Sequence, residues 1–155
     1  MTNALDLSPL EWGEALKAMG QPAFRAGQVF SWLHKGAKFS GMGNLPRALR
    51  EALAAEYDDV GVTIFERFPS KLDGTVKYLY RLADGNLIEG VRMRYHYGDT
   101  LCVSTQVGCR MGCKFCASTL GGLVRSLTPA EMLGEVYEAE RQAGEPISSL
   151  VLMGI

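Results

Sequence analysis

The chain has 155 residues, of which 47% are hydrophobic and 21% are charged, and its formal net charge is −1. This composition is typical of a globular protein, and it excludes a disordered chain and a membrane-embedded one. The length allows one ordinary domain or two small ones.

The N-terminal sequence shows no targeting signal. Residues 1–8 contain no basic segment followed by an apolar one, so we expect no signal peptide. No apolar run reaches the length of a membrane span. We therefore expect a cytoplasmic protein without membrane contact, in which reduced cysteines are normal.

Helices are expected over residues 1–59. Ser8 and Glu11 have the spacing of a capping box, with Pro9 at the first helical position. This first helix should end at Gly20, where glycine favours a helix C-terminus. Two further helices are expected, over residues 22–36 and 44–57. The buried stripe expected on the second helix consists of Phe24, Phe30 and Leu33.

Basic residues dominate part of this helical segment. Between positions 17 and 50 there are six basic residues and no acidic one. They are Lys17, Arg25, Lys35, Lys38, Arg47 and Arg50. Such a local excess attracts a polyanion such as RNA, and the alternative is a set of solvated helix faces.

A small antiparallel β-meander is expected over residues 60–98. The turn dipeptides Asp73-Gly74 and Asp84-Gly85 separate strand-like segments over residues 62–68, 76–82 and 87–94. The expected meander also carries aromatic residues that could stack on bases or pack in a core, and in a small sheet core packing is the commoner role. These residues are Phe65, Tyr78, Tyr80 and Tyr95.

Three cysteines follow the next expected strand, which covers residues 101–106. Cys109, Cys113 and Cys116 have the spacing C-x3-C-x2-C, and two glycines in the same loop give the backbone freedom to curl around a common centre. Cysteine thiolates are the usual ligands of iron–sulfur clusters. Three thiolates leave one iron of a four-iron cluster open to a substrate or cofactor.

A structural zinc site is the main alternative for the cysteines. Zinc also takes four cysteines at short spacings, and Cys102 could be the fourth ligand. Such sites usually pair two short cysteine knuckles, whereas this chain has one triplet. The spacing alone therefore leaves both kinds of site open.

The last part of the chain indicates a β–loop–α–β unit. Thr128 and Glu131 form a second capping box, which opens a helix that we expect to end near Ala143. Residues 149–153 are a nearly continuous apolar run, typical of a parallel strand covered on both faces. In such units the chemistry lies at the C-terminal end of a strand, which here is the start of the cysteine loop.

The stretch of residues 101–122, LCVSTQVGCRMGCKFCASTLGG, resembles the cluster loop of radical S-adenosylmethionine (SAM) enzymes. It is most similar to the RlmN/Cfr family, which methylates C2 or C8 of adenosine in RNA. Residues 22–25 and 44–46 also resemble the small helical N-terminal domain of that family, to which RNA contact is ascribed. The resemblance implies an α/β fold with a helical domain (1–59), a linking β-meander (60–98) and the beginning of a partial (β/α) barrel (99–155).

The resemblance also implies roles for individual residues. Cys109, Cys113 and Cys116 would hold a 4Fe–4S cluster whose open iron binds SAM, and Phe115 would contact the cluster or SAM. Glu89 matches the family's proton acceptor. Cys102 matches the cysteine that resolves the RNA–protein adduct and forms a transient disulfide with a methyl-carrying cysteine near the family's C-terminus.

The function that follows from the resemblance is methylation of adenosine C2 in 23S rRNA, with tRNA as a second substrate. An electron donor such as flavodoxin or ferredoxin is implied, as is a monomeric full-length enzyme. The alternatives are a C8-specific Cfr-type methyltransferase and a non-enzymatic zinc-binding RNA-interaction module. Because the family's remaining SAM contacts and methyl-carrying cysteine would lie beyond Ile155, we expect this chain to be an N-terminal portion that is inactive alone.

Overall fold

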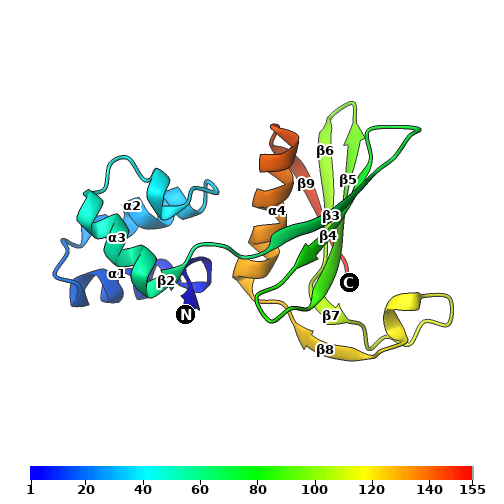
Figure 1. The fold of residues 1–155 in the computed structure, drawn as a ribbon, viewed down its shortest axis with the longest axis horizontal. Coiled ribbons are helices and arrows are strands. Elements are labelled where there is room, and N and C mark those ends of the chain that lie inside the picture. The colour runs from blue at the N-terminus through cyan, green and yellow to red at the C-terminus, as the bar shows by residue number, and fades with distance from the viewer. Residues whose placement is uncertain (155) are drawn as a thin grey trace. The chain divides into compact units, whose positions relative to one another are not determined.

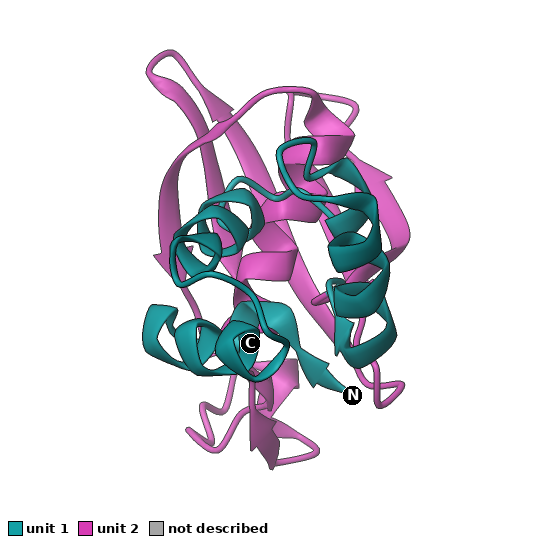
Figure 2. Cartoon of the chain, turned by 90° about the vertical axis from the view of Figure 1, so that its left-hand side faces the viewer, with its two compact units in different colours: residues 1–60 teal, residues 61–155 magenta. Residues whose placement is uncertain are grey.

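The computed structural model describes residues 1–154, which fold into two compact units (Figure 2). The first unit consists of residues 1–60, and the second begins at Gly61. None of the helices in the described residues is both long and apolar enough to cross a membrane.

The first unit is helical. Its elements are β1 (Thr2–Asn3), the 3-10 turn η1 (Ala4–Asp6), α1 (Pro9–Ala18), α2 (Phe24–Leu33), η2 (Phe39–Gly41), α3 (Arg47–Glu56) and β2 (Tyr57–Asp58). The capping box expected at the start of α1 is present, with Ser8 Oγ accepting from the Glu11 amide and Glu11 accepting from the Ser8 amide. The core contains Trp12, Leu16, Val29, Leu33, Phe39, Met42, Leu49 and Leu53.

One expectation for the second helix is wrong. Phe24 is the first residue of α2 and is 61% exposed, so it does not belong to a buried stripe. The buried positions of the helix are Ala26, Val29 and Leu33, which repeat at the helical interval of three to four residues. Phe24 instead lies beside the guanidinium of Arg25, which is 5.0 Å from its ring centre.

The second unit is built on a five-stranded sheet in the order β3-β4-β5-β6-β9 (Figure 1). The strands are β3 (Thr63–Pro69), β4 (Val76–Arg81), β5 (Leu87–Tyr95), β6 (Gly98–Val103) and β9 (Ile147–Leu152). Strands β3 to β5 form the expected antiparallel meander, β6 continues it in antiparallel pairing with β5, and β9 pairs with β6 in parallel. The segments expected as meander and barrel start therefore contribute to one sheet.

Helix α4 (Pro129–Ala143) connects β6 to β9 and packs on one face of the sheet (Figure 1). Its expected capping box is present, and Gly144 ends it in the left-handed conformation. Alternate residues of β4 point toward this helix, so Tyr78 and Tyr80 are fully buried. These two tyrosines are core residues, whereas Phe65 and Tyr95 are 48% and 44% exposed.

The strand expected over residues 101–106 is not continuous. Strand β6 ends at Val103, and β7 (Gln106–Gly108) pairs instead with β8 (Leu123–Ser126), a strand that we did not expect. The 3-10 turn η3 (Ala117–Thr119) lies in the loop between them. The cysteine loop is therefore the tip of a small antiparallel hairpin.

Candidate active site

Glu89 and Cys102 lie on the same face of two neighbouring strands. Cys102 is the register partner of Val91, which is two positions beyond Glu89 on β5. Side chains two positions apart on a strand share a face, and diagonal cross-strand neighbours are about 7–8 Å apart. The alternate residues Ile88 and Leu101 are buried in the core beneath α4. The two predicted site residues therefore lie on the face opposite α4, which we call the open face.

Lys77 accompanies Glu89 on the open face. Its ammonium nitrogen is 3.0 Å from Glu89 Oε1, and both side chains are about half exposed, at 43% and 51%. An ion pair in this setting contributes at most about 1 kcal/mol to stability, so its main effect is to orient the carboxylate. Lys77 was not among the site residues predicted from sequence, although its alternation with Tyr78 and Tyr80 places it on this face.

The C-terminal ends of β6 and β9 meet beside these residues. Ser104 Oγ donates to the Glu89 carbonyl over 2.7 Å, which ties the end of β6 to β5. Thr105 Oγ1 donates to the Met153 carbonyl over 2.6 Å, and the Met153 amide donates to Val103. At the point where β6 ends, hydrogen bonds from side-chain hydroxyl groups thus replace the regular backbone hydrogen bonds between strands. This replacement explains the break before β7.

The cysteine loop is closed at its base by β7 and β8. Gln106 pairs with Ser126, and Gly108 pairs with Leu123. Gly108 has φ +70°, and a Cβ atom there would lie 2.1 Å from the Gly122 carbonyl oxygen. Only glycine fits so close to another backbone. We call this closed base, residues 106–108 and 122–126, the neck of the cysteine loop.

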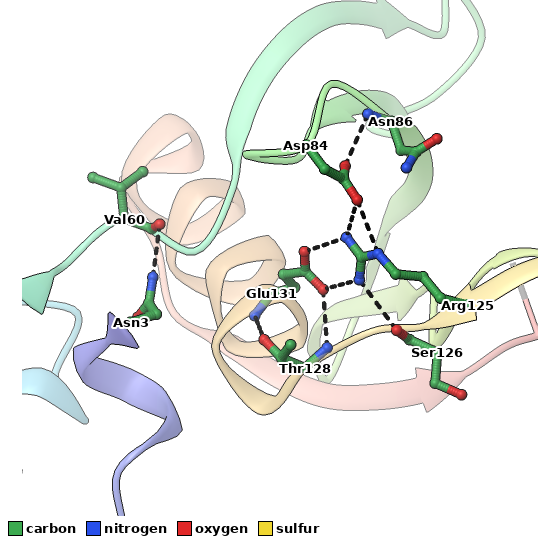
Figure 3. A network of polar contacts seen from close by, with 8 residues as sticks. All are labelled: Asn3, Val60, Asp84, Asn86, Arg125, Ser126, Thr128 and Glu131. Carbon is green, nitrogen blue, oxygen red and sulfur yellow. Dashed lines mark hydrogen bonds and ion pairs between the residues drawn. The ribbon is translucent and has the colours of Figure 1, made fainter. Parts of the chain in front are cut away.

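Arg125 anchors the neck to the rest of the second unit (Figure 3). Its guanidinium donates to Asp84 Oδ2 over 2.9 and 2.7 Å and to both carboxylate oxygens of Glu131 over 2.7 Å. These bonds raise the pKa of Arg125, with Glu131 as the largest cause. Asp84 belongs to the β4–β5 turn, and Glu131 closes the capping box of α4 with Thr128. The clamp therefore fixes β8 against both elements.

The three loop cysteines are free thiols that the structure does not bring together. Cys109 is buried, and a Cβ atom on Gly154 would lie 3.3 Å from its Sγ. Cys113 and Cys116 are half-buried in one turn, in which the Cys116 amide donates to the Cys113 carbonyl over 3.0 Å. Among residues 1–154, no three Cys, His, Asp or Glu side chains form a group that could hold a metal ion.

The donor set nevertheless fits an iron–sulfur cluster. All three thiols belong to one loop, none is engaged in a disulfide, and soft thiolates are the ligands that such clusters require. Gly112 has φ +68°, and space is open around its Cα. Phe115 is 93% exposed, so its ring is available to a ligand. Binding would require the loop beyond the neck to contract.

Glu135 is a buried acid that the sequence analysis did not single out. Its side chain projects from α4 toward the sheet and is fully buried, with Oε2 accepting from the Ser104 amide over 3.2 Å. Within residues 1–154, Oε1 has no hydrogen-bond partner. A Cβ atom on Gly90 would lie 3.2 Å from Oε2 and also from the Cys102 carbonyl oxygen. Burial raises the pKa of Glu135 to about 8, opposed by the Ser104 hydrogen bond.

The predicted basic surface of the first unit is partly neutralised. Arg47 pairs with Glu51 over 2.7 Å, at the edge of the stretch that lacks acids. Arg50 donates to the Ser40 carbonyl over 2.5 Å. With Ala54, these residues line a pocket of about 410 Å³. The two arginines thus lie together on a concave surface formed by α3 and η2.

Comparison with known proteins identifies relatives of this chain. Residues 2–58 match the family model described as the ribosomal RNA large subunit methyltransferase N-terminal domain. A probable dual-specificity RNA methyltransferase RlmN from Lachnoclostridium phytofermentans is 51% identical, and the match covers 99% of this chain and 45% of the relative. A protein of the same description from Clostridium acetobutylicum is 46% identical with the same coverage. This chain matches the N-terminal portion of the RlmN family.

A solved structure supports the RlmN assignment at the level of the fold. The crystal structure of a radical SAM methyltransferase from Sphaerobacter thermophilus matches with a TM-score of 0.89 and 38% identity, over 100% of this chain and 47% of that one. The chain thus spans slightly less than half the length of the proteins it matches. The expected mixed α/β fold is confirmed.

Proposed function

We propose that the protein to which these residues belong is a radical SAM methyltransferase that modifies C2 of adenosine in RNA. One observation carries the proposal. In a chain that matches the RlmN family, Glu89 and Cys102 lie on the open face, and β6 leads from them into a loop that bears three free thiols. An acid, a thiol and a loop that carries three soft metal ligands therefore follow one another at one end of one sheet.

Cys109, Cys113 and Cys116 would hold a 4Fe–4S cluster, and Phe115 would lie against the cluster or SAM. When bound, such a cluster supplies one-electron chemistry to SAM. The contribution of this chain is to hold the ligands in position. The neck and the Arg125 clamp fix both ends of the loop relative to β6, while the segment between them stays free to adapt.

Glu89 would accept a proton from the reacting adenosine on its carboxylate, and Lys77 would orient that carboxylate. A general base must be ionised and within hydrogen-bonding reach of its proton. Glu89 is half exposed on the open face, so a base that enters there can reach Oε1 or Oε2. Cys102 is half-buried on the same face, and its free thiol would resolve the RNA–protein adduct.

The RNA substrate would present a base out of its helix, since enzymes that do chemistry on a base take it out of the stack and into the active site. We propose 23S rRNA as the substrate, tRNA as a second one, and flavodoxin or ferredoxin as the electron donor of a monomeric cytoplasmic enzyme. We also propose that β6, α4 and β9 form the first unit of a partial (β/α) barrel. Their parallel β–α–β connection supports this.

Anaerobic reconstitution with iron and sulfide tests the proposed cofactor. We expect about four iron and four sulfide per chain. Cys113→Ala should abolish their incorporation, and Cys102→Ala is the matched control that should retain the cluster. The proposal is refuted if the unaltered chain binds one zinc ion and takes up no iron, and if both variants lose the zinc. That result would identify a zinc site with Cys102 as a ligand.

A further inference from the structure

Two exposed phenylalanines of β3 lie on the open face, the face on which Glu89 also lies. Phe65 and Phe68 are 48% and 44% exposed, although both are in a strand. Each ring is covered by a cation of β4. The Arg81 guanidinium lies 4.0 Å from the centre of the Phe65 ring, and the Lys77 ammonium lies 5.3 Å from that of Phe68. We call these four residues the aromatic row.

A β-bulge puts both rings on one face. In a regular strand, residues 65 and 68 would point to opposite faces, because side chains alternate. The register of β3 against β4 shifts between Ile64 and Glu66, so that Ile64 pairs with Tyr80 and Phe68 pairs with Lys77. Tyr80 is buried under α4, and Lys77 is on the open face. The extra residue at position 65 therefore brings Phe68 to the open face beside Phe65.

The aromatic row leads directly to the candidate catalytic acid. Lys77 contacts the Phe68 ring and also forms the ion pair with Glu89. Leu79, between Lys77 and Arg81 on the same face, pairs in register with Glu89. Because β4 lies between β3 and β5, the backbones that carry the rings and the carboxylate are two strand spacings apart, or about 10 Å. Neighbouring nucleotides of one RNA strand can span this distance.

We propose that the aromatic row binds the unpaired nucleotides that flank the target adenosine, by stacking bases on Phe65 and Phe68 and by placing phosphates beside Arg81 and Lys77. The inference rests on the proposed RNA-modifying function and specifies its substrate as single-stranded at this surface. Alternating aromatic and cationic side chains are the usual means by which proteins bind single strands, because every base has a face that stacks.

The charge of the surrounding hairpin favours an anionic partner. Strands β3 and β4 and their turn carry four basic residues against two acidic ones. The basic residues are Arg67, Lys71, Lys77 and Arg81, and the acidic ones are Glu66 and Asp73. Local positive charge beside exposed rings distinguishes this surface from an uncharged apolar patch that would bind another protein.

Binding of a fluorescent RNA hairpin with an unpaired adenosine in its loop tests the inference. A blunt duplex of equal length is the comparison. Phe65→Leu with Phe68→Leu keeps apolar bulk and removes both rings. We expect the hairpin affinity to fall at least fivefold, which is the low end for the loss of one stacked base. Affinity for the duplex should change less than twofold. Circular dichroism verifies that the variant is folded.

Tyr95→Leu with Tyr97→Leu is the matched control. These exposed rings stack on each other at 5.1 Å, next to the β5–β6 turn at the opposite end of β5 from Glu89. Their removal should leave hairpin affinity within twofold. In a second measurement, Lys77→Gln with Arg81→Gln should reduce the slope of log affinity against log salt by about 1.4, as expected for two phosphate contacts to a single strand.

Three outcomes decide the inference. A selective loss for the hairpin in the phenylalanine variant supports it. The inference is wrong if the phenylalanine variant and the unaltered chain have the same affinity for the hairpin. If Arg47→Glu with Arg50→Glu weakens binding in that case, an RNA-binding function still stands. If the unaltered chain binds neither RNA, both the inference and RNA binding by this segment are refuted.

Discussion

Replacing Glu135 by glutamine should stabilise the second unit in a way that depends on pH. The folded state raises the pKa of Glu135 from 4.5 to about 8, chiefly because the side chain is fully buried and also because of the nearby charge of Glu131. Between these two values the folded chain keeps a proton that the unfolded chain releases. The stability of the unaltered chain therefore falls as pH rises through this window and levels off above it.

The size of the effect follows from the pKa. One pKa unit corresponds to about 1.4 kcal/mol, so the shift gives a cost that approaches about 4–5 kcal/mol above pH 8. Glutamine has nearly the same shape as the protonated acid and does not ionise. We therefore expect the variant and the unaltered chain to be similar near pH 5, and the advantage of the variant to grow by about 3 kcal/mol by pH 8.

Urea unfolding at several pH values measures this difference. Circular dichroism follows both units, whereas tryptophan fluorescence reports on the first unit alone, since Trp12 and Trp32 are the two tryptophans of the chain. Glu138→Gln is the control on the same helix, because Glu138 pairs at the surface with Arg141. Its effect should stay below about 1 kcal/mol. An advantage for Glu135→Gln that does not change with pH, or a loss at every pH, would refute the buried-acid explanation.

Three further changes test other parts of the structure. Arg125→Ala should destabilise the second unit by about 2–3 kcal/mol in urea unfolding, because it leaves the nearly buried carboxylate of Glu131 unpaired; equal stability would show that the clamp is only a surface contact. Gly108→Ala should lower iron retention after reconstitution and cost at least about 2 kcal/mol, since it combines backbone strain with a clash at the neck. Its control Gly112→Ala has a similar φ in open space and should cost only about 1 kcal/mol, so equal losses would contradict the close approach at Gly108. Arg47→Glu with Arg50→Glu should weaken RNA binding at low salt and flatten its salt dependence, and unchanged affinity would show that this surface is merely solvated.

The elements that could be predicted from sequence are those whose signals are local. Both capping boxes, at Ser8 and Thr128, specify a helix start within four residues, and both are present. The turn dipeptides likewise defined the meander. The break after Val103 could not be predicted, because Ser104 and Thr105 bond to Glu89 and Met153, which are distant in the chain.

The candidate site was predictable in part for the same reason. The three loop cysteines were apparent from spacing, and strand alternation could place Glu89 and Cys102 on one face once the register was known. Lys77, Arg125 and Glu135 were missed, because each acts through a partner on another element. A charged residue on an amphipathic helix is normally predicted to be exposed. Glu135 is an exception to this rule, which only its packing against Gly90 reveals.

The neck also limits which part of the chain can become more ordered when the proposed cluster binds. Because the backbone contact between Gly108 and Gly122 and the clamp at Arg125 fix both ends of the loop, the order gained on loading is confined to the residues between them. The entropy lost on loading is then that of a short tethered segment and not of a whole domain. Hydrogen exchange should slow within residues 109–121 and stay the same in β5 and β6, so a loaded and an unloaded chain present the same open face to RNA.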